Sequence, residues 1–155
     1  MRRSKPSSER RFGDERGSAS LEFLTVGLIL LVPLVYLVLA IASVQAGALA
    51  VEGAARHAAR VAVLAADDSA ARTAVDRAVR IALEDYGVDA GRASVEVTCD
   101  PASACTQPGA RVRVDVDAAV VLPLVPDVFG LDRFGSVQVS ASATQTVSRF
   151  AEGLR

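Results

Sequence analysis

The chain has 155 residues, of which 51% are hydrophobic, and it contains two cysteines and no tryptophan. Its formal net charge is -1, whereas proteins that bind nucleic acid through the phosphates are typically strongly basic. The length leaves room for one compact domain once a leader and one apolar segment are set aside.

The first 17 residues form a basic leader. Six basic residues outnumber three acidic ones there: Arg2, Arg3, Lys5, Arg10, Arg11 and Arg16 against Glu9, Asp14 and Glu15. The leader therefore carries +3 and the rest of the chain -4. Positive charge beside an apolar segment favours the cytoplasmic side of a membrane. Nucleic-acid binding is the alternative, but the basic residues are mixed with acids, so we expect no nucleic-acid partner.

An uncharged stretch runs from Phe23 to Val51, and residues 23–42 are its most apolar part. A helix that crosses the hydrocarbon core needs roughly 20 such residues, so this segment is long enough to span a membrane. Pro33 removes one backbone hydrogen bond and should bend or loosen the helix. Ordinary secretion is the alternative, because Ala40-Ile-Ala42 offers a small-residue cleavage site that would leave a chain beginning near Ser43.

The junction between leader and apolar stretch reads Gly17-Ser-Ala-Ser-Leu-Glu22-Phe. A carboxylate at the centre of a bilayer costs on the order of 2.5 to 3.5 kcal/mol, so a glutamate beside an apolar helix calls for a partner. The amino terminus of a neighbouring subunit is one candidate. The alternative is that Glu22 lies in the headgroup region, where the positive N-terminus of the helix favours it.

Residues 45–64 are rich in alanine and lack proline, so the sequence predicts that the helix continues well beyond the apolar part. Glu52, Arg56 and Arg60 recur every four residues with the acid first, which is the favourable order for such pairs. Small residues recur on another face, where they allow close helix approach or reflect the alanine-rich composition alone: Ala42, Ala46, Ala50, Ala54, Ala58 and Ala62.

The Gly-x-x-x-x-Glu-Phe entry, the apolar run with its proline, and the sequence Ala-Ala-Arg-His-Ala-Ala-Arg at 54–60 together resemble the TadE-like family of minor pseudopilins, from tight-adherence (Flp) type IV pilus systems. The resemblance covers roughly residues 17–62. It implies that a prepilin peptidase cuts after Gly17, which makes Ser18 the first residue and Glu22 the fifth. Arg56 and Arg60 match the arginines of the family's post-membrane segment.

The resemblance further implies assembly or initiation of an adhesive pilus, with other pilins or pseudopilins and membrane lipid as partners of the N-terminal helix. We expect a single-pass protein of the cytoplasmic membrane: a cytoplasmic leader (1–17), a transmembrane and extended helix (18–64), and an extracytoplasmic domain (65–155). An unprocessed, signal-anchored binding or sensor protein is the alternative, since it would need the same membrane helix but no peptidase.

Beyond residue 64 the sequence Ala65-Ala-Asp-Asp-Ser69 breaks the helix, and Ser69 is a suitable N-cap for a second one that ends near Tyr86-Gly87. Apolar residues recur along it at helical spacing: Ala71, Ala74, Val75, Ala78, Val79, Ala82, Leu83 and Tyr86. We expect this face to pack on a core. A lipid-binding surface helix is the alternative, but the polar face mixes both signs of charge.

The last third of the chain alternates as strands do. Inward positions are expected at Val95, Val97 and Cys99, at Val112, Val114, Val116 and Ala118, and at Val137, Val139, Ala141 and Ala143. The sequence thus predicts an α+β domain with a three-stranded antiparallel sheet, covered on one side only. The serines and threonines of the polar face could form a binding edge or a solvated surface. Residues 120–134 are expected to form an apolar loop that caps the core or meets another subunit.

Cys99 and Cys105 bracket a short loop, and outside the cytoplasm we expect them to form a disulfide. A metal site would need further ligands, and His57, the only histidine, is expected to be a solvated helix residue. His57 is also a poor base for a catalytic triad, and the sequence has no phosphate-cradling glycine pattern. We therefore expect no enzymatic activity, cofactor, metal or small-molecule substrate.

Overall fold

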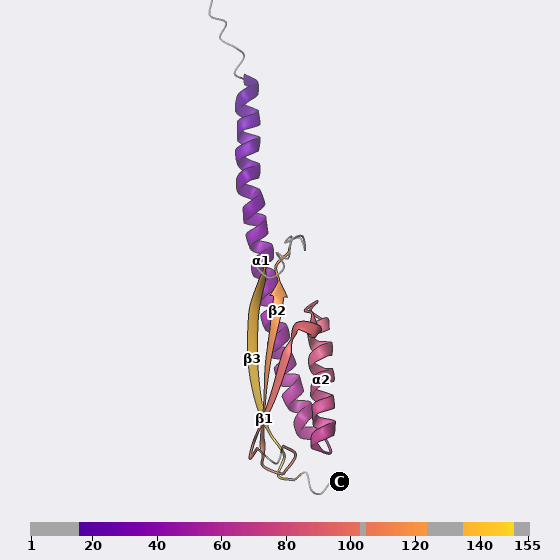
Figure 1. Ribbon diagram of the computed structural model, residues 1–155. Helices are drawn as coiled ribbons and strands as arrows, with labels where there is room; N and C mark the ends of the chain where they lie inside the picture. The colour runs from indigo at the N-terminus through magenta and orange to yellow at the C-terminus, as the bar shows by residue number, and fades with distance from the viewer. Residues whose placement is uncertain (1–15, 103–104, 124–134, 151–155) are drawn as a thin grey trace, which may run out of the picture. The chain divides into compact units, whose positions relative to one another are not determined.

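The computed structural model describes residues 16–102, 105–123 and 135–150 (Figure 1). In chain order its elements are α1 (Arg16–Leu64), α2 (Asp68–Glu84), the short 3-10 helix η1 (Ala90–Arg92), β1 (Ser94–Asp100), β2 (Arg111–Val121) and β3 (Ser136–Thr146). The chain divides into two compact units, Met1–Leu37 and Val38–Arg155. The predicted α+β class is confirmed: a long apolar N-terminal helix, a second helix and a three-stranded antiparallel sheet.

The large apolar side chains in the first part of α1 are exposed. Between Ser20 and Leu64, the most apolar 18-residue window of the helix has a mean hydropathy of 2.8, and none of that window is buried. Phe23 is 78% exposed and Leu30 66% exposed. The helix continues through Pro33 without interruption. A core helix of a globular protein buries at least one stripe of its surface, whereas this segment buries none and is long and apolar enough to cross a membrane.

In the second unit α1 turns one face toward the core. That face consists almost entirely of alanine: Ala50, Ala54, Ala55, Ala58, Ala59 and Ala62 are each no more than 1% exposed. They share one core cluster with buried residues of α2 and of the sheet. The predicted small-residue ridge thus allows a close approach inside this domain from Ala50 onward, while Ala42 is exposed and Ala46 is half-buried.

Helix α2 begins slightly earlier than predicted. Asp67, not Ser69, is the N-cap: its carboxylate accepts a 2.8 Å hydrogen bond from the Ala70 backbone N–H. The Ser69 hydroxyl donates a 2.6 Å hydrogen bond to the same carboxylate. The prediction was wrong because two good N-cap residues lie two positions apart, and the charged one gains more from the positive end of the helix.

The C-terminal end of α2 is closed by a left-handed glycine. Gly87 has a φ of 69°, its N–H bonds the Glu84 carbonyl at 2.9 Å, and the Val88 N–H bonds the Leu83 carbonyl at 2.9 Å. This pattern is a Schellman motif, and its usual apolar contact brings Val88 into the core beside Leu83. Tyr86 was predicted to face the core and is instead 54% exposed, because the turn at Gly87 replaces it with Val88.

The sheet has the strand order β1-β2-β3, and both pairings are antiparallel, as predicted. Val97, Val114 and Ala143 lie opposite one another across the three strands, and the other inward residues follow the same register. Val112, Val114 and Val116 on the central strand are no more than 1% exposed. α2 and the second half of α1 cover this face, while the opposite, polar face remains mostly exposed.

The strands differ from the prediction mainly at one end of the sheet. β2 extends through Val120 and Val121, which were expected to begin a loop, and a 2.7 Å hydrogen bond from the Leu122 N–H to the Gly135 carbonyl continues the pairing. The expected apolar loop otherwise falls on residues 124–134, outside the described residues. Val137 has the predicted register, opposite Val120, but is 37% exposed because it lies at the end of the edge strand.

Candidate functional site

The predicted processing residues lie in the first two turns of α1. The helix begins at Arg16, so Gly17 is already helical, slightly earlier than the predicted start at residue 18. Residues 1–15 of the leader fall outside the described residues. Ser18 and Glu22 are four residues apart, so their backbones lie about one helical turn from each other.

Glu22 is the single charge at the edge of a long apolar surface. Its side chain is exposed, and its neighbours Leu21 and Phe23 are 67% and 78% exposed. Among the residues that the structure describes, Glu22 has neither a hydrogen-bond partner nor an ion-pair partner. The next charged residue in the sequence is Glu52. Any partner of this carboxylate therefore lies in the leader, in the solvent or on another molecule.

Arg56 and Arg60 lie on the outer face of α1 in the second unit. Arg56 forms an ion pair with Glu52, one turn earlier, and their side chains remain 71% and 49% exposed, so the predicted i,i+4 pairing is confirmed for this pair. Arg60 and His57 are also exposed, as predicted for His57. These residues share a face with Leu49, which is 59% exposed, so the face is available to a partner and contributes nothing to the core.

The two cysteines are brought together as predicted. The Sγ atoms of Cys99 and Cys105 lie 2.02 Å apart and their Cα atoms 5.2 Å apart. The disulfide joins the end of β1 to the connection that leads into β2. It belongs to the second unit, whereas the processing residues belong to the first, so it acts as a structural link within the folded domain.

The polar face of the sheet contains one well-formed ion pair. Arg113 donates from its Nε and a terminal nitrogen to the Asp115 carboxylate, at 2.8 to 3.0 Å. These hydrogen bonds lower the pKa of Asp115; burial opposes them in part, and the opposite charge of Arg113 adds a smaller lowering effect. The pair offsets the like charge of Glu96, which lies directly opposite Asp115 on β1. Its role is therefore structural.

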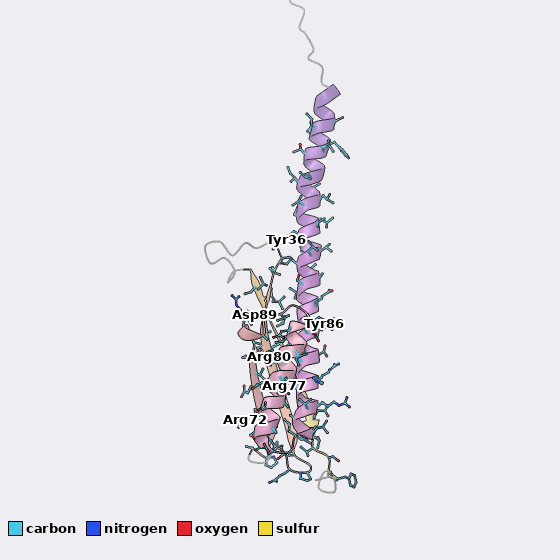
Figure 2. The ribbon with its side chains drawn as sticks, turned by 90° about the vertical axis from the view of Figure 1, so that its right-hand side faces the viewer. Tyr36, Arg72, Arg77, Arg80, Tyr86 and Asp89 are labelled. Atoms are coloured by element: carbon cyan, nitrogen blue, oxygen red, sulfur yellow. A yellow bond between two sulfur atoms is a disulfide. The ribbon has the colours of Figure 1, made fainter. Side chains whose placement is uncertain are left out.

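A cavity of about 680 Å³ lies between α2, η1 and β1. Charges of both signs line it, among them Arg77, Arg80 and Asp89, which Figure 2 shows along α2 and just beyond its end. Within the described ranges, no group of three or more His, Cys, Asp or Glu residues could hold a metal ion. The cavity thus offers a charged surface trough without an evident acid–base pair.

No protein-family model matches the chain, and no curated protein or solved structure matches it. The function is therefore inferred from the residues and their geometry.

The sequence did not predict the roles of two residues at one end of the sheet. Gly47 contacts the end of β2, and the only sequence feature that could have indicated this contact is a glycine within an alanine-rich helix. Tyr86 lies exposed beside this contact, and the sequence feature that could have indicated its exposure is the glycine that follows it.

Proposed function

We propose that the chain is a minor pseudopilin-like membrane protein that takes part in assembling or initiating a tight-adherence (Flp) type IV pilus after prepilin-peptidase processing. The observation that carries the proposal is the apolar helix, whose large side chains are exposed, with Gly17 and Glu22 at its entrance. A helix that exposes so much apolar surface needs lipid or neighbouring helices around it. A pseudopilin uses both in turn, first as a membrane anchor and then as an assembly element.

In this arrangement the leader lies in the cytoplasm, α1 crosses the membrane once, and the second unit lies outside the cytoplasm. The charge of +3 on the first 17 residues supports this orientation. The Cys99–Cys105 disulfide supports an oxidising compartment for the folded unit. The length of that unit supports a minor subunit, since the resemblance implies major subunits that are little more than the helix.

Cleavage after Gly17 would create a new positive charge next to Glu22. The new amino terminus at Ser18 would lie one helical turn from Glu22 of the same chain. The two charges could therefore pair within the monomer before the subunit is assembled. In an assembly, Glu22 could exchange this partner for the amino terminus of a neighbour. Either pairing reduces the cost of placing a carboxylate near the hydrocarbon core.

The decisive experiment is the N-terminal sequence and intact mass of the protein extracted from native membranes. A chain that begins at Ser18 supports the proposal. A chain that retains the leader indicates the alternative, a signal-anchored binding or sensor protein, and a chain that begins near Ser43 indicates ordinary secretion. Gly17→Leu should block cleavage, whereas Gly27→Leu should not, because a side chain at Gly27 meets nothing within 4 Å.

A second experiment addresses the carboxylate. Glu22→Ala should impair incorporation into pili while membrane insertion is retained, because the apolar helix is unchanged. Glu52→Ala is the matched control, since it removes a glutamate from the same helix outside the apolar segment. Normal incorporation of the Glu22 variant would contradict the charge-pairing role.

A further inference from the structure

Two glutamates limit where α1 can lie in a bilayer. No charge occurs between Glu22 and Glu52, and the stretch between them would measure about 43 Å at ~1.5 Å per residue. This length matches a whole bilayer, about 40–45 Å with its headgroup layers and ~30 Å in hydrocarbon alone. A hydrocarbon core placed anywhere in this stretch ends between Ala42 and Val51.

Other parts of the second unit contact α1 between Ala42 and Val51. A cavity of about 250 Å³ is lined by Ser43, Ala46 and Gly47 from α1 and by the end of β2 and the α2–η1 connection. The contact is close: a Cβ added at Gly47 would lie 2.1 Å from Val120 Cγ2. Gly47 lies at most ~7.5 Å beyond Ala42 along the helix. If the core instead ends at Val51, Gly47 lies ~6 Å inside it. A headgroup layer is about 5–7.5 Å thick, so this contact lies within about one headgroup thickness of the hydrocarbon boundary in every placement.

β2 continues past this contact toward the residues of α1 that precede Gly47 (Figure 1). β2 runs opposite to the second half of α1 (Figure 1), so Val121 and Leu122 lie one and two residues closer to the hydrocarbon than Val120, at ~3.3 Å per residue. Val121 is 43% exposed and Val137, at the start of β3, is 37% exposed. Neither 118–123 nor 135–139 contains a charged residue.

Tyr86 completes this end of the domain. It lines the same cavity as Gly47 and is 54% exposed, and tyrosine is enriched where an apolar ring and a polar hydroxyl can both be satisfied, at the membrane interface. Asp89 also lines this cavity, and it is paired with Arg92 at 3.5 Å. The described lining contains no basic residue, so the cavity itself offers no positive charge to attract anionic lipid.

We propose that Tyr86, Val121, Leu122 and Val137 form a membrane-seating surface that rests in the headgroup layer of a phospholipid bilayer. The proposal depends on the membrane span of the proposed function, but not on leader cleavage or pilus assembly. Its occupant is lipid because the surface adjoins the apolar helix at the depth where headgroups lie. The contact is apolar, so it does not require anionic lipid.

The absence of tryptophan from the chain allows a direct depth measurement. Single reporters Tyr86→Trp and Val121→Trp would be placed in the full-length protein, reconstituted in phosphatidylcholine vesicles with or without bromine on the upper acyl chain. Tyr36→Trp is the control within the span. Leu64→Trp is the distal control, since Leu64 is 75% exposed and lies ~33 Å along the helix from Ala42.

We expect bromine to quench Tyr86→Trp and Val121→Trp by at least half of the fractional loss seen for Tyr36→Trp, and to leave Leu64→Trp unquenched. Quenching at both reporters should be the same when anionic lipid is added. Emission of both reporters that matches Leu64→Trp, or quenching that requires anionic lipid, would overturn the proposal. Loss of quenching at Tyr36→Trp would show that the span itself is absent, which separates that failure from a failure of seating.

Discussion

Gly47 gives the sharpest test of the packing between α1 and the sheet. A methyl group added there would lie 2.1 Å from Val120 Cγ2 and 3.2 Å and 3.3 Å from its Cβ and Cγ1. Val120 is only 6% exposed, and its β-branched side chain has few alternative rotamers. Gly47→Ala therefore cannot be accommodated by a simple side-chain rotation.

The expected size depends on two opposing effects. Overpacking of a buried contact costs about 1–3 kcal/mol, and alanine gains about 1 kcal/mol over glycine in a helix. Gly53→Ala is the matched control on the same helix, because its new methyl group meets nothing within 4 Å; it should gain the helix term alone. The free energy of unfolding of Gly47→Ala should thus be ~1–3 kcal/mol below that of Gly53→Ala.

Denaturant unfolding of the full-length protein in a mild nonionic detergent, followed by circular dichroism, measures this difference. The double variant Gly47→Ala/Val120→Ala should recover part of the loss relative to the sum of its single changes, because the second change removes the clashing methyl groups. Equal stabilisation by Gly47→Ala and Gly53→Ala would refute the close contact between α1 and β2.

Three further predictions concern the folded unit. Leu83 is 0% exposed, so Leu83→Ala should lower the free energy of unfolding by about 2–5 kcal/mol. Ile81 is 51% exposed, so the control Ile81→Ala should cost less than ~1 kcal/mol. Similar denaturation midpoints for the two variants would contradict the assignment of Leu83 to the core. Replacing both cysteines of the disulfide by serine should cost about 2 kcal/mol for so short a loop, and an unchanged midpoint would count against it. Because Arg113 lowers the pKa of Asp115, this ion pair stabilises the fold at any pH above the ordinary carboxyl pKa of about 4. The stabilisation is lost as the pH falls below that value and through the lowered pKa of Asp115. Unfolding curves at neutral and acid pH should therefore show that Arg113→Gln loses stability relative to the unchanged protein only at neutral pH.

The sheet and the long helix are predicted by patterns that extend over many residues of the sequence. Alternating valines such as Val112, Val114 and Val116 predict both the inward face and the register, because a slip of one residue would expose all of them. The uncharged run before Glu52 predicts a helix whose first part finds no partner in the described chain. Such patterns survive small errors at their ends, which is why the architecture was predictable.

Element ends and long-range contacts were less accessible. Asp67 and Ser69 are both good helix caps, and local preference alone could not rank them. Tyr86 continues the helical period of α2, but the left-handed turn at Gly87 overrides that period. The contact of Gly47 with Val120 joins residues far apart in the sequence, and glycine in a helix signals a close approach without saying what approaches.

The alanine face of α1 has a consequence for mutational tolerance along this one helix. In the first unit, exchanges among large apolar residues at exposed positions such as Leu30 preserve the hydropathy of the segment, so they should leave the proposed membrane insertion unchanged. In the second unit, Ala54 and Ala58 are fully buried, and each added methylene must displace a strand or α2. A single uninterrupted helix therefore obeys two rules of substitution, one based on hydropathy and the other on side-chain volume.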